Sequence, residues 1–211
     1  MKRYIAAFVL ASMLVLSLAL AEPLEPSGDL WVQDQANVLS EETEGLIFFS
    51  NQRMAESASG EVVVVTVDTT GDVDIGDFAY ALFNDWDINA QGALVLLAIR
   101  DEDYYTIPGA LLGESLSSAE ITAMYDEYLE DDFAAGNYDA GVRRFFTALF
   151  DRVAEIEGVS VRAADGAADY EAWKAQYGQQ EEPAPTPEAT PEAGLETPAP
   201  VPTPTAETHR I

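Results

Sequence analysis

Carboxylate side chains are the residues of this sequence best suited to chemistry, and they gather where apolar runs end. In open α/β sheets, ligands bind in the crevice beyond the carboxyl ends of the strands, where these carboxylates are expected. Oxygen ligands of this kind suit hard cations, so we expect a bound calcium ion, or alternatively magnesium. The predicted metal ligands are Asp34, Asp68, Asp72, Asp74, Asp101 and Asp103.

Each acidic group also has an interpretation that involves no ligand. Asp72 or Asp74 could cap the helix that follows, residues 101–103 could form a solvated hairpin tip, and Asp34 could bond nearby backbone amides in a turn. The spacing fits no EF-hand loop. The residues alone therefore leave both interpretations open.

Several kinds of catalysis are excluded by composition. The chain has no Cys, which removes disulfides, thiolate metal sites and Cys nucleophiles. Its one His, His209, lies near the C-terminal end, so the folded region cannot hold a Ser-His-Asp triad or a His general base. No glycine-rich phosphate loop of a standard spacing occurs. The sequence therefore favours binding over catalysis.

The strong negative charge restricts the class of partner. A net charge of −28 opposes binding to nucleic acid and to anionic lipid, because both are polyanions. It favours divalent cations or basic partners. The alternative is that the acidity simply keeps an exported protein in solution.

Both ends of the chain are expected to lie outside the folded domain. Residues 1–21 read as a signal peptide, with a basic start, an apolar run and a small-x-small pattern that predicts cleavage after Ala21. This predicts an extracytoplasmic protein, secreted or in the cell envelope, with no stable transmembrane segment after cleavage; an uncleaved anchor is the alternative. Residues 22–29 read as a linker. Residues 179–211, rich in Pro, Glu and Thr, are expected to be disordered.

Between residues 30 and 158 the apolar pattern alternates between helix and strand periods. Alternation of this kind implies an α/β fold with a partly parallel central sheet and helices on both faces. Residues 159–178 could add a peripheral helix or serve as a linker. The predicted elements are a helix at 41–57, a strand at 61–67, a helix at 75–86, strands at 93–99 and 104–108, a helix from Ser117 or Ser118, and a helix at 142–156.

Several segments resemble the TPM domain family, named for thylakoid, phosphatase and membrane associations. Residues 32–40, V-Q-D-Q-A-N-V-L-S, resemble the family's opening D-x-A-N-V-L-S motif, and residues 92–98, G-A-L-V-L-L-A, resemble its second strand. Residues 138–141, Y-D-A-G, resemble a late element of the family. The likeness spans residues 30–151 and implies a Rossmann-like three-layer sandwich with a mixed central sheet.

The resemblance also implies functions, namely acid phosphatase activity in plant members and calcium binding in others. Three family carboxylates near the presumed site are missing or moved, at Ala90-Gln91-Gly92, at residues 109–113 and at Ser118. We therefore expect a non-catalytic module that binds calcium, a protein partner of the cell envelope, or both. The alternative is a metal-assisted acid phosphatase of low activity, in which Arg100 would clamp the phosphate.

Overall fold

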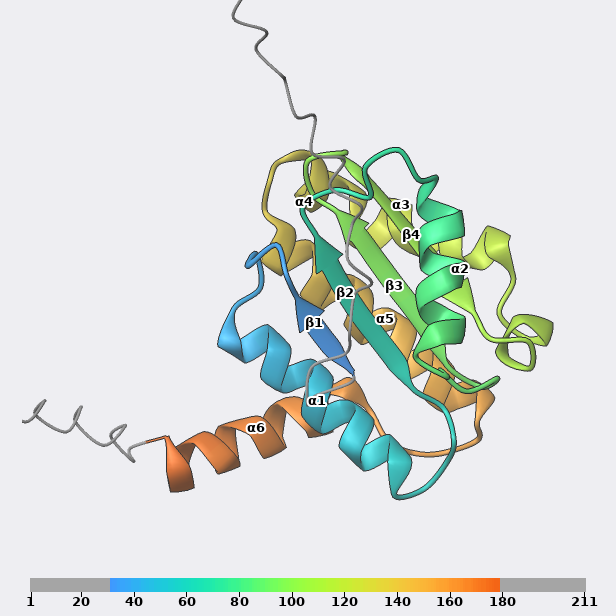
Figure 1. Cartoon of the computed structure of the whole chain (residues 1–211). Helices are drawn as coiled ribbons and strands as arrows, with labels where there is room; N and C mark the ends of the chain where they lie inside the picture. Colours follow the sequence, from blue (N-terminus) through green and yellow to red (C-terminus); the bar gives the residue numbers. More distant parts are fainter. Residues whose placement is uncertain (1–30, 179–211) are drawn as a thin grey trace, which may run out of the picture.

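The computed structural model describes residues 31–178, which form a mixed four-stranded sheet between two layers of helices (Figure 1). The strands are β1 (Val32–Asp34), β2 (Val62–Val67), β3 (Ala93–Ala98) and β4 (Asp103–Pro108), in that order across the sheet. β1, β2 and β3 are parallel, whereas β4 runs antiparallel to β3 as the predicted hairpin partner. The three-layer α/β sandwich expected from the sequence is confirmed. The predicted signal peptide, linker and Pro-rich tail lie outside the described residues.

Alternate side chains of β2 divide the interior into two cores, because successive residues of a strand point to opposite faces. Val62 and Val64 pack with α1 and α5, whereas Val63 and Val65 pack with α2. Of the described helices, none is both long and apolar enough to cross a membrane. The helices are α1 (Glu41–Ala55), α2 (Ile75–Asp85), the 3-10 helix η1 (Leu112–Glu114), α3 (Ser118–Tyr128), α4 (Glu130–Ala134), α5 (Tyr138–Ile156) and α6 (Ala163–Tyr177).

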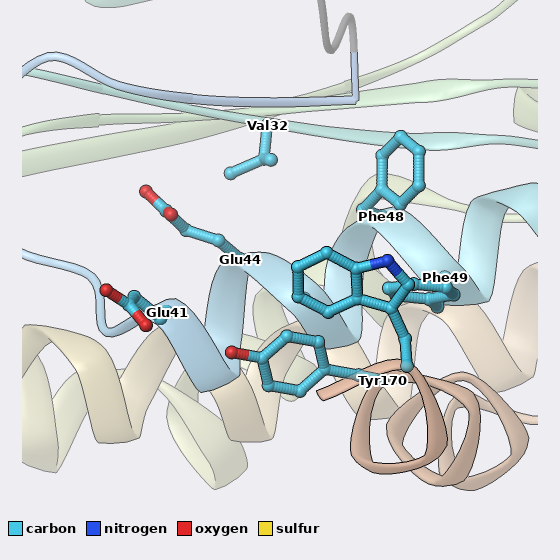
Figure 2. Close-up of a pocket in the computed structure, with 8 residues that line it drawn as sticks. Val32, Glu41, Glu44, Phe48, Phe49 and Tyr170 are labelled. Carbon is cyan, nitrogen blue, oxygen red and sulfur yellow. The ribbon is translucent and has the colours of Figure 1, made fainter. Parts of the chain in front are cut away.

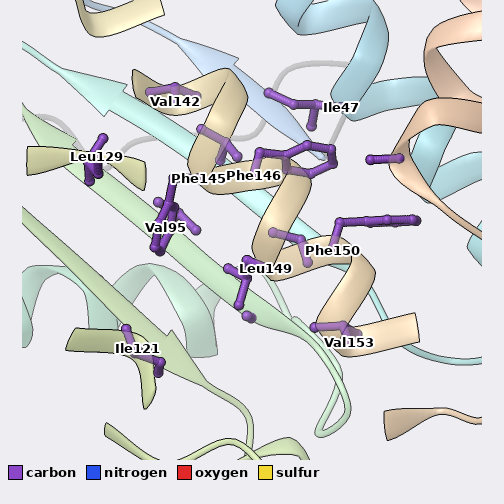
Figure 3. Close-up of a cluster of buried hydrophobic side chains, with 14 of the residues drawn as sticks. Ile47, Val95, Ile121, Leu129, Val142, Phe145, Phe146, Leu149, Phe150 and Val153 are labelled. Atoms are coloured by element: carbon purple, nitrogen blue, oxygen red, sulfur yellow. The ribbon is translucent and has the colours of Figure 1, made fainter. Parts of the chain in front are cut away.

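The larger core is built around α5, whose apolar side chains recur at helical spacing and face the sheet (Figure 3). Phe145, Phe146 and Phe150 are buried there together with Val95 of β3 and Ile47 of α1. Large-to-small substitutions of such residues cost about 3–5 kcal/mol. α5 therefore anchors the sheet and α1 in fixed positions.

Each of the connections β1–α1–β2 and β2–α2–β3 moves the chain one strand further in the same direction across the sheet. The helix α1 lies on one face of the sheet and α2 lies on the other. The two connections therefore have opposite hands, and one is the uncommon left-handed crossover. The segments that follow β1 and β2 leave the sheet toward opposite faces. Asp34 ends β1 and Asp68 follows β2, so these two residues flank the point at which the chain leaves the sheet toward opposite faces.

Three short elements were not predicted, namely β1, α4 and the three-residue 3-10 helix η1. β1 has three residues, two of which are the polar Gln33 and Asp34, so no alternating pattern marks it as a strand; its pairing with β2 defines it. α4 has five residues and follows α3 directly, with Leu129 between them. All three segments are shorter than the window over which periodicity is informative.

Residues 163–177, for which the sequence left helix and linker open, form α6, which packs against α1. A Cβ atom on Gly45 would lie 2.3 Å from the Tyr170 ring, and one on Gly166 would lie 2.4 Å from the backbone nitrogen of Ser50. Glycine at these two positions lets the helices approach at backbone distance. Arg53 of α1 also pairs with Asp169 of α6. α6 is therefore an integral layer of the fold.

Candidate functional site

Asp34, the first predicted metal ligand, closes the turn that follows β1. Its Oδ2 accepts a hydrogen bond from the Leu39 amide at 2.8 Å, and its Oδ1 accepts one from the Val38 amide at 3.1 Å. The hydroxyl of Thr66 on β2 also donates to Oδ1. Both carboxylate oxygens of Asp34 therefore serve the turn, as the interpretation without a ligand expected.

Asp74 and Asp101 are occupied by local donors as well. Asp74 is the N-cap of α2 and accepts from the Gly76 amide at 2.9 Å. Asp101 accepts from the Thr69 hydroxyl at 2.7 Å and from the Thr70 amide at 2.8 Å. These bonds, the Thr69 bond first, lower the pKa of Asp101, because they favour its charged form. Asp101 thereby ties the loop after β2 to the turn between β3 and β4.

The other three predicted ligands lie at the surface. Asp72 is exposed in the turn before α2, and Asp103 is exposed and accepts from the Tyr104 amide at 2.9 Å. Asp68 lies 3.6 Å from the Arg100 guanidinium, and both side chains are about two-thirds exposed. Arg100, the phosphate clamp of the phosphatase hypothesis, is therefore a surface group paired with a carboxylate.

The residues present do not form a ready-made calcium site. Within residues 31–178, no group of three or more His, Cys, Asp or Glu side chains is placed to hold a metal ion. Calcium takes about six to eight oxygen ligands, whereas Asp34, Asp74 and Asp101 already accept bonds from protein donors. The structure joins Asp101 to the loop of residues 68–74 and leaves Asp34 with its own turn. Calcium binding at these loops stays a prediction.

A second region has the geometry of a binding surface: an apolar groove of about 370 Å³ between α1, α6 and β1. Figure 2 shows Glu41 and Glu44 toward one end of it and Phe48 and Phe49 toward the other. We call it the α1–α6 groove. Its lining residues are Val32, Glu41, Glu44, Gly45, Phe48, Phe49, Tyr170 and Trp173.

Aromatic rings from both α1 and α6 line the α1–α6 groove and contact one another. Phe49 lies with its ring centroid 6.1 Å from that of Tyr170 and 6.3 Å from that of Trp173. Trp173 stacks on Tyr170 at an interplanar angle of 17° and contacts Tyr177. Trp173 is nevertheless 46% exposed and Tyr177 is 44% exposed. Large apolar side chains exposed side by side mark interaction surfaces in soluble proteins.

The groove was not identified from the sequence. Tyr170, Trp173 and Tyr177 follow the i, i+3, i+7 spacing of one helix face, and this stripe was a readable signal. The opposite wall comes from Phe48 and Phe49, more than a hundred residues earlier in the chain. Only the packing of α6 on α1 brings the two walls together.

Two solved structures are similar to this chain, and the first of them supports the fold. The N-terminal domain of a P. gingivalis protein, solved by NMR, is 22% identical, with 62% of this chain and 86% of that chain covered and a TM-score of 0.56. The BA42 protein of Bizionia argentinensis is 18% identical, with 59% of this chain and 92% of that chain covered and a TM-score of 0.45. No curated protein matches.

The family model described as the TPM domain matches residues 32–152. This match spans more than half of the chain, from β1 through most of α5, and it ends before α6 begins. The α6 wall of the groove thus lies outside the matched range. On this match, and on the sheet and helices described above, the chain belongs to the TPM domain family.

Proposed function

We propose that this TPM-domain protein is an exported, non-catalytic module that binds a protein partner in the cell envelope through the α1–α6 groove. The observation that carries the proposal is Trp173, which stands 46% exposed over an apolar groove. Trp and Tyr supply much of the binding energy at protein interfaces, because they bury a large area and lose little side-chain entropy. The signal-peptide pattern of residues 1–21 supports export.

The wall that carries Trp173 is held in place without a partner. Lys174, the next residue of α6, lies 3.4 Å from Glu42 of α1, and Arg53 pairs with Asp169 one turn earlier. Tyr170 packs against Gly45 with no room for a larger residue. A preorganised aromatic anchor avoids much of the ordering cost of association.

Site-specific photo-cross-linking in the full chain tests the proposal. A benzophenone amino acid replaces Trp173 in one variant and Tyr80 in the other; Tyr80 is 62% exposed on α2, on the other face of the sheet. We expect one partner to cross-link in cells at position 173 and not at position 80. Equal products at both positions, or none at 173, would contradict the proposal.

Calcium enters as a second candidate ligand, at the loops of residues 68–74 and 101–103. One observation favours calcium binding there. Asp101 accepts hydrogen bonds that hold the two loops together, and the side chains of Asp68 and Asp72 are exposed in the same region. Exposed carboxylates without a built cage bind calcium weakly, at the millimolar end of the protein range. Calcium would then act on loop stability rather than on partner recognition.

A further inference from the structure

We infer that the α1–α6 groove accepts a basic, apolar segment of its partner, with a Lys or Arg side chain between the glutamates and the rings. In this arrangement the apolar side chains of the partner segment that flank the Lys or Arg pack against Phe48 and Phe49. The inference rests on the proposed function and adds the chemistry of the partner. Three observations support this inference: the negative charge around the groove, the aromatic rings that line it, and the negative charge of the other candidate occupants.

The charge around the groove is negative. Glu41, Glu42 and Glu44 occupy the first turn of α1, and Glu171 follows on α6. Lys174 opposes them, and it already pairs with Glu42 at 3.4 Å and with Glu171 at 2.9 Å. The amino end of a helix contributes only about half a positive charge. A cationic side chain entering beside Glu41 and Glu44 therefore meets a favourable field.

The rings of the groove wall can hold a cation, and one example is already present. The ammonium group of Lys174 lies 4.8 Å from the centroid of the Tyr170 ring. The indole of Trp173 stacks beside this ring and is the stronger cation–π acceptor of the two residue types. Trp173 is 46% exposed, so part of this side chain is accessible to a second cation from solvent. Glutamates and aromatic faces together suit Lys and Arg.

Other occupants fit the charge poorly. The chain's own residues 179–211 are rich in Pro, which suits aromatic grooves, but they carry six glutamates against Arg210. A second copy of this chain brings a net charge of −28. Like charges brought together at an interface cost several kcal/mol, so the basic segment of another protein is favoured.

The test uses the chain from Glu22 to Ile211, with its three Trp residues, Trp31, Trp86 and Trp173, labelled as 5-fluorotryptophan and followed by ¹⁹F NMR. The probes are seven-residue peptides in which Leu alternates with Lys, with Gln or with Glu. We expect the Lys peptide to shift the Trp173 signal saturably and to leave that of the buried Trp86 in place. The Glu peptide should produce no shift.

Two double variants separate charge from packing. Glu41→Gln with Glu44→Gln should weaken the Lys peptide about fivefold, because a surface charge pair contributes on the order of 1 kcal/mol. Asp77→Asn with Asp85→Asn removes the same charge from exposed positions of α2 and should leave the affinity for the Lys peptide unchanged. Raising the salt should weaken binding in the unsubstituted chain more than in the Glu41, Glu44 variant.

Three outcomes would overturn the inference. Equal affinity for the Lys and Gln peptides, unchanged by the Glu41 and Glu44 substitutions, would show an apolar groove without charge selection, and the proposed function would stand. A shift of Trp173 on deleting residues 179–211 would show that the tail occupies the groove. Loss of the cross-link at position 173 as well as of all peptide binding would remove both proposals.

Discussion

The strand-end loops and the α1–α6 groove use their side chains in opposite ways. At the loops, Asp34, Asp74 and Asp101 have the residue types of a metal site, yet they accept bonds that close a turn, cap a helix and join two loops. At the groove, Trp173 has no side-chain oxygen with which to coordinate a metal ion, yet it stands exposed on a fixed wall. The residue types of the loops suggested a binding site from the sequence alone, whereas the groove is identified only by the packing of α6 on α1.

The largest expected effect comes from separating α6 from α1 with Gly166→Ala. Alanine in a helix normally stabilises by about 1 kcal/mol relative to glycine. Here its Cβ would lie 2.4 Å from the backbone nitrogen of Ser50, so we expect a net loss of about 2–3 kcal/mol. Urea unfolding measures the loss, and fluorescence quenching reports whether Trp173 becomes more accessible.

Gly113→Ala is the matched control for that variant. Its Cβ would meet only the Pro108 ring, at 3.7 Å, which is an ordinary contact, so its effect should stay within about 0.5 kcal/mol. Equal stability of the two variants would mean that α6 is loosely attached. The wall of the groove would then not be preorganised.

The second prediction compares two carboxylates of the loops. Asp34→Ala removes the acceptor of the Val38 and Leu39 amides, and we expect a cost of about 2 kcal/mol in the free energy of unfolding. Asp72→Ala removes an exposed side chain and should cost less than about 0.5 kcal/mol. Chemical denaturation in metal-free buffer measures both costs. A larger cost for Asp72→Ala than for Asp34→Ala would mean that Asp72, and not Asp34, stabilises the fold.

The third prediction concerns pH, through Asp101. Its bonds to Thr69 and Thr70 lower its folded-state pKa below the ordinary value of 3.8. The stabilisation is therefore present above that value and is lost as the pH falls through the lower folded-state pKa. We expect Asp101→Asn to flatten the decline of the urea midpoint below a pH of about 4.

Thr69→Val provides the check on this interpretation, because it removes the hydroxyl donor that lowers the pKa of Asp101 most and keeps the carboxylate. It should reproduce part of the flattening. A decline as steep as that of the unsubstituted chain in both variants would assign the acid sensitivity to other carboxylates.

Calcium should give the smallest effect. A ligand present at its own dissociation constant stabilises the folded state by RT ln 2, about 0.4 kcal/mol, so weak loop binding raises the unfolding temperature slightly. The double variant Asp68→Asn with Asp72→Asn should abolish the rise. A shift worth about 2.7 kcal/mol, expected at a hundred times the dissociation constant, would instead reveal a tight site.

The sequence was informative where apolar periodicity is long. α2 and the buried strands β2 and β3 were predicted near their observed bounds, and the end of α5 was predicted correctly, although this helix begins at Tyr138 and not at residue 142. The TPM resemblance at residues 32–40 identified the family. Ser40, which directly precedes the predicted helix, caps α1 and accepts a hydrogen bond from the Thr43 amide. Local pattern and capping chemistry suffice for such elements.

The groove could not be predicted, because its walls meet only in the folded chain. Gly45 and Gly166 permit the close approach of α1 and α6, but a glycine inside a helix pattern does not reveal which helix it faces. The carboxylates of the loops were located correctly at the strand ends. Whether a carboxylate accepts hydrogen bonds from nearby backbone amides or coordinates a metal ion is decided by geometry that the spacing of residues in the sequence does not reveal.

One measurement tests the central claim most directly: a ¹H–¹⁵N correlation spectrum of the full chain, titrated with the Leu-Lys peptide in buffer that contains calcium. We predict that the peptide shifts the amide signals of Gly45, Phe48 and Trp173 and leaves those of residues 68–74 and 101–103 in place. Shifts confined to the two loops, with the α1 and α6 signals unmoved, would contradict the assignment of binding to the α1–α6 groove.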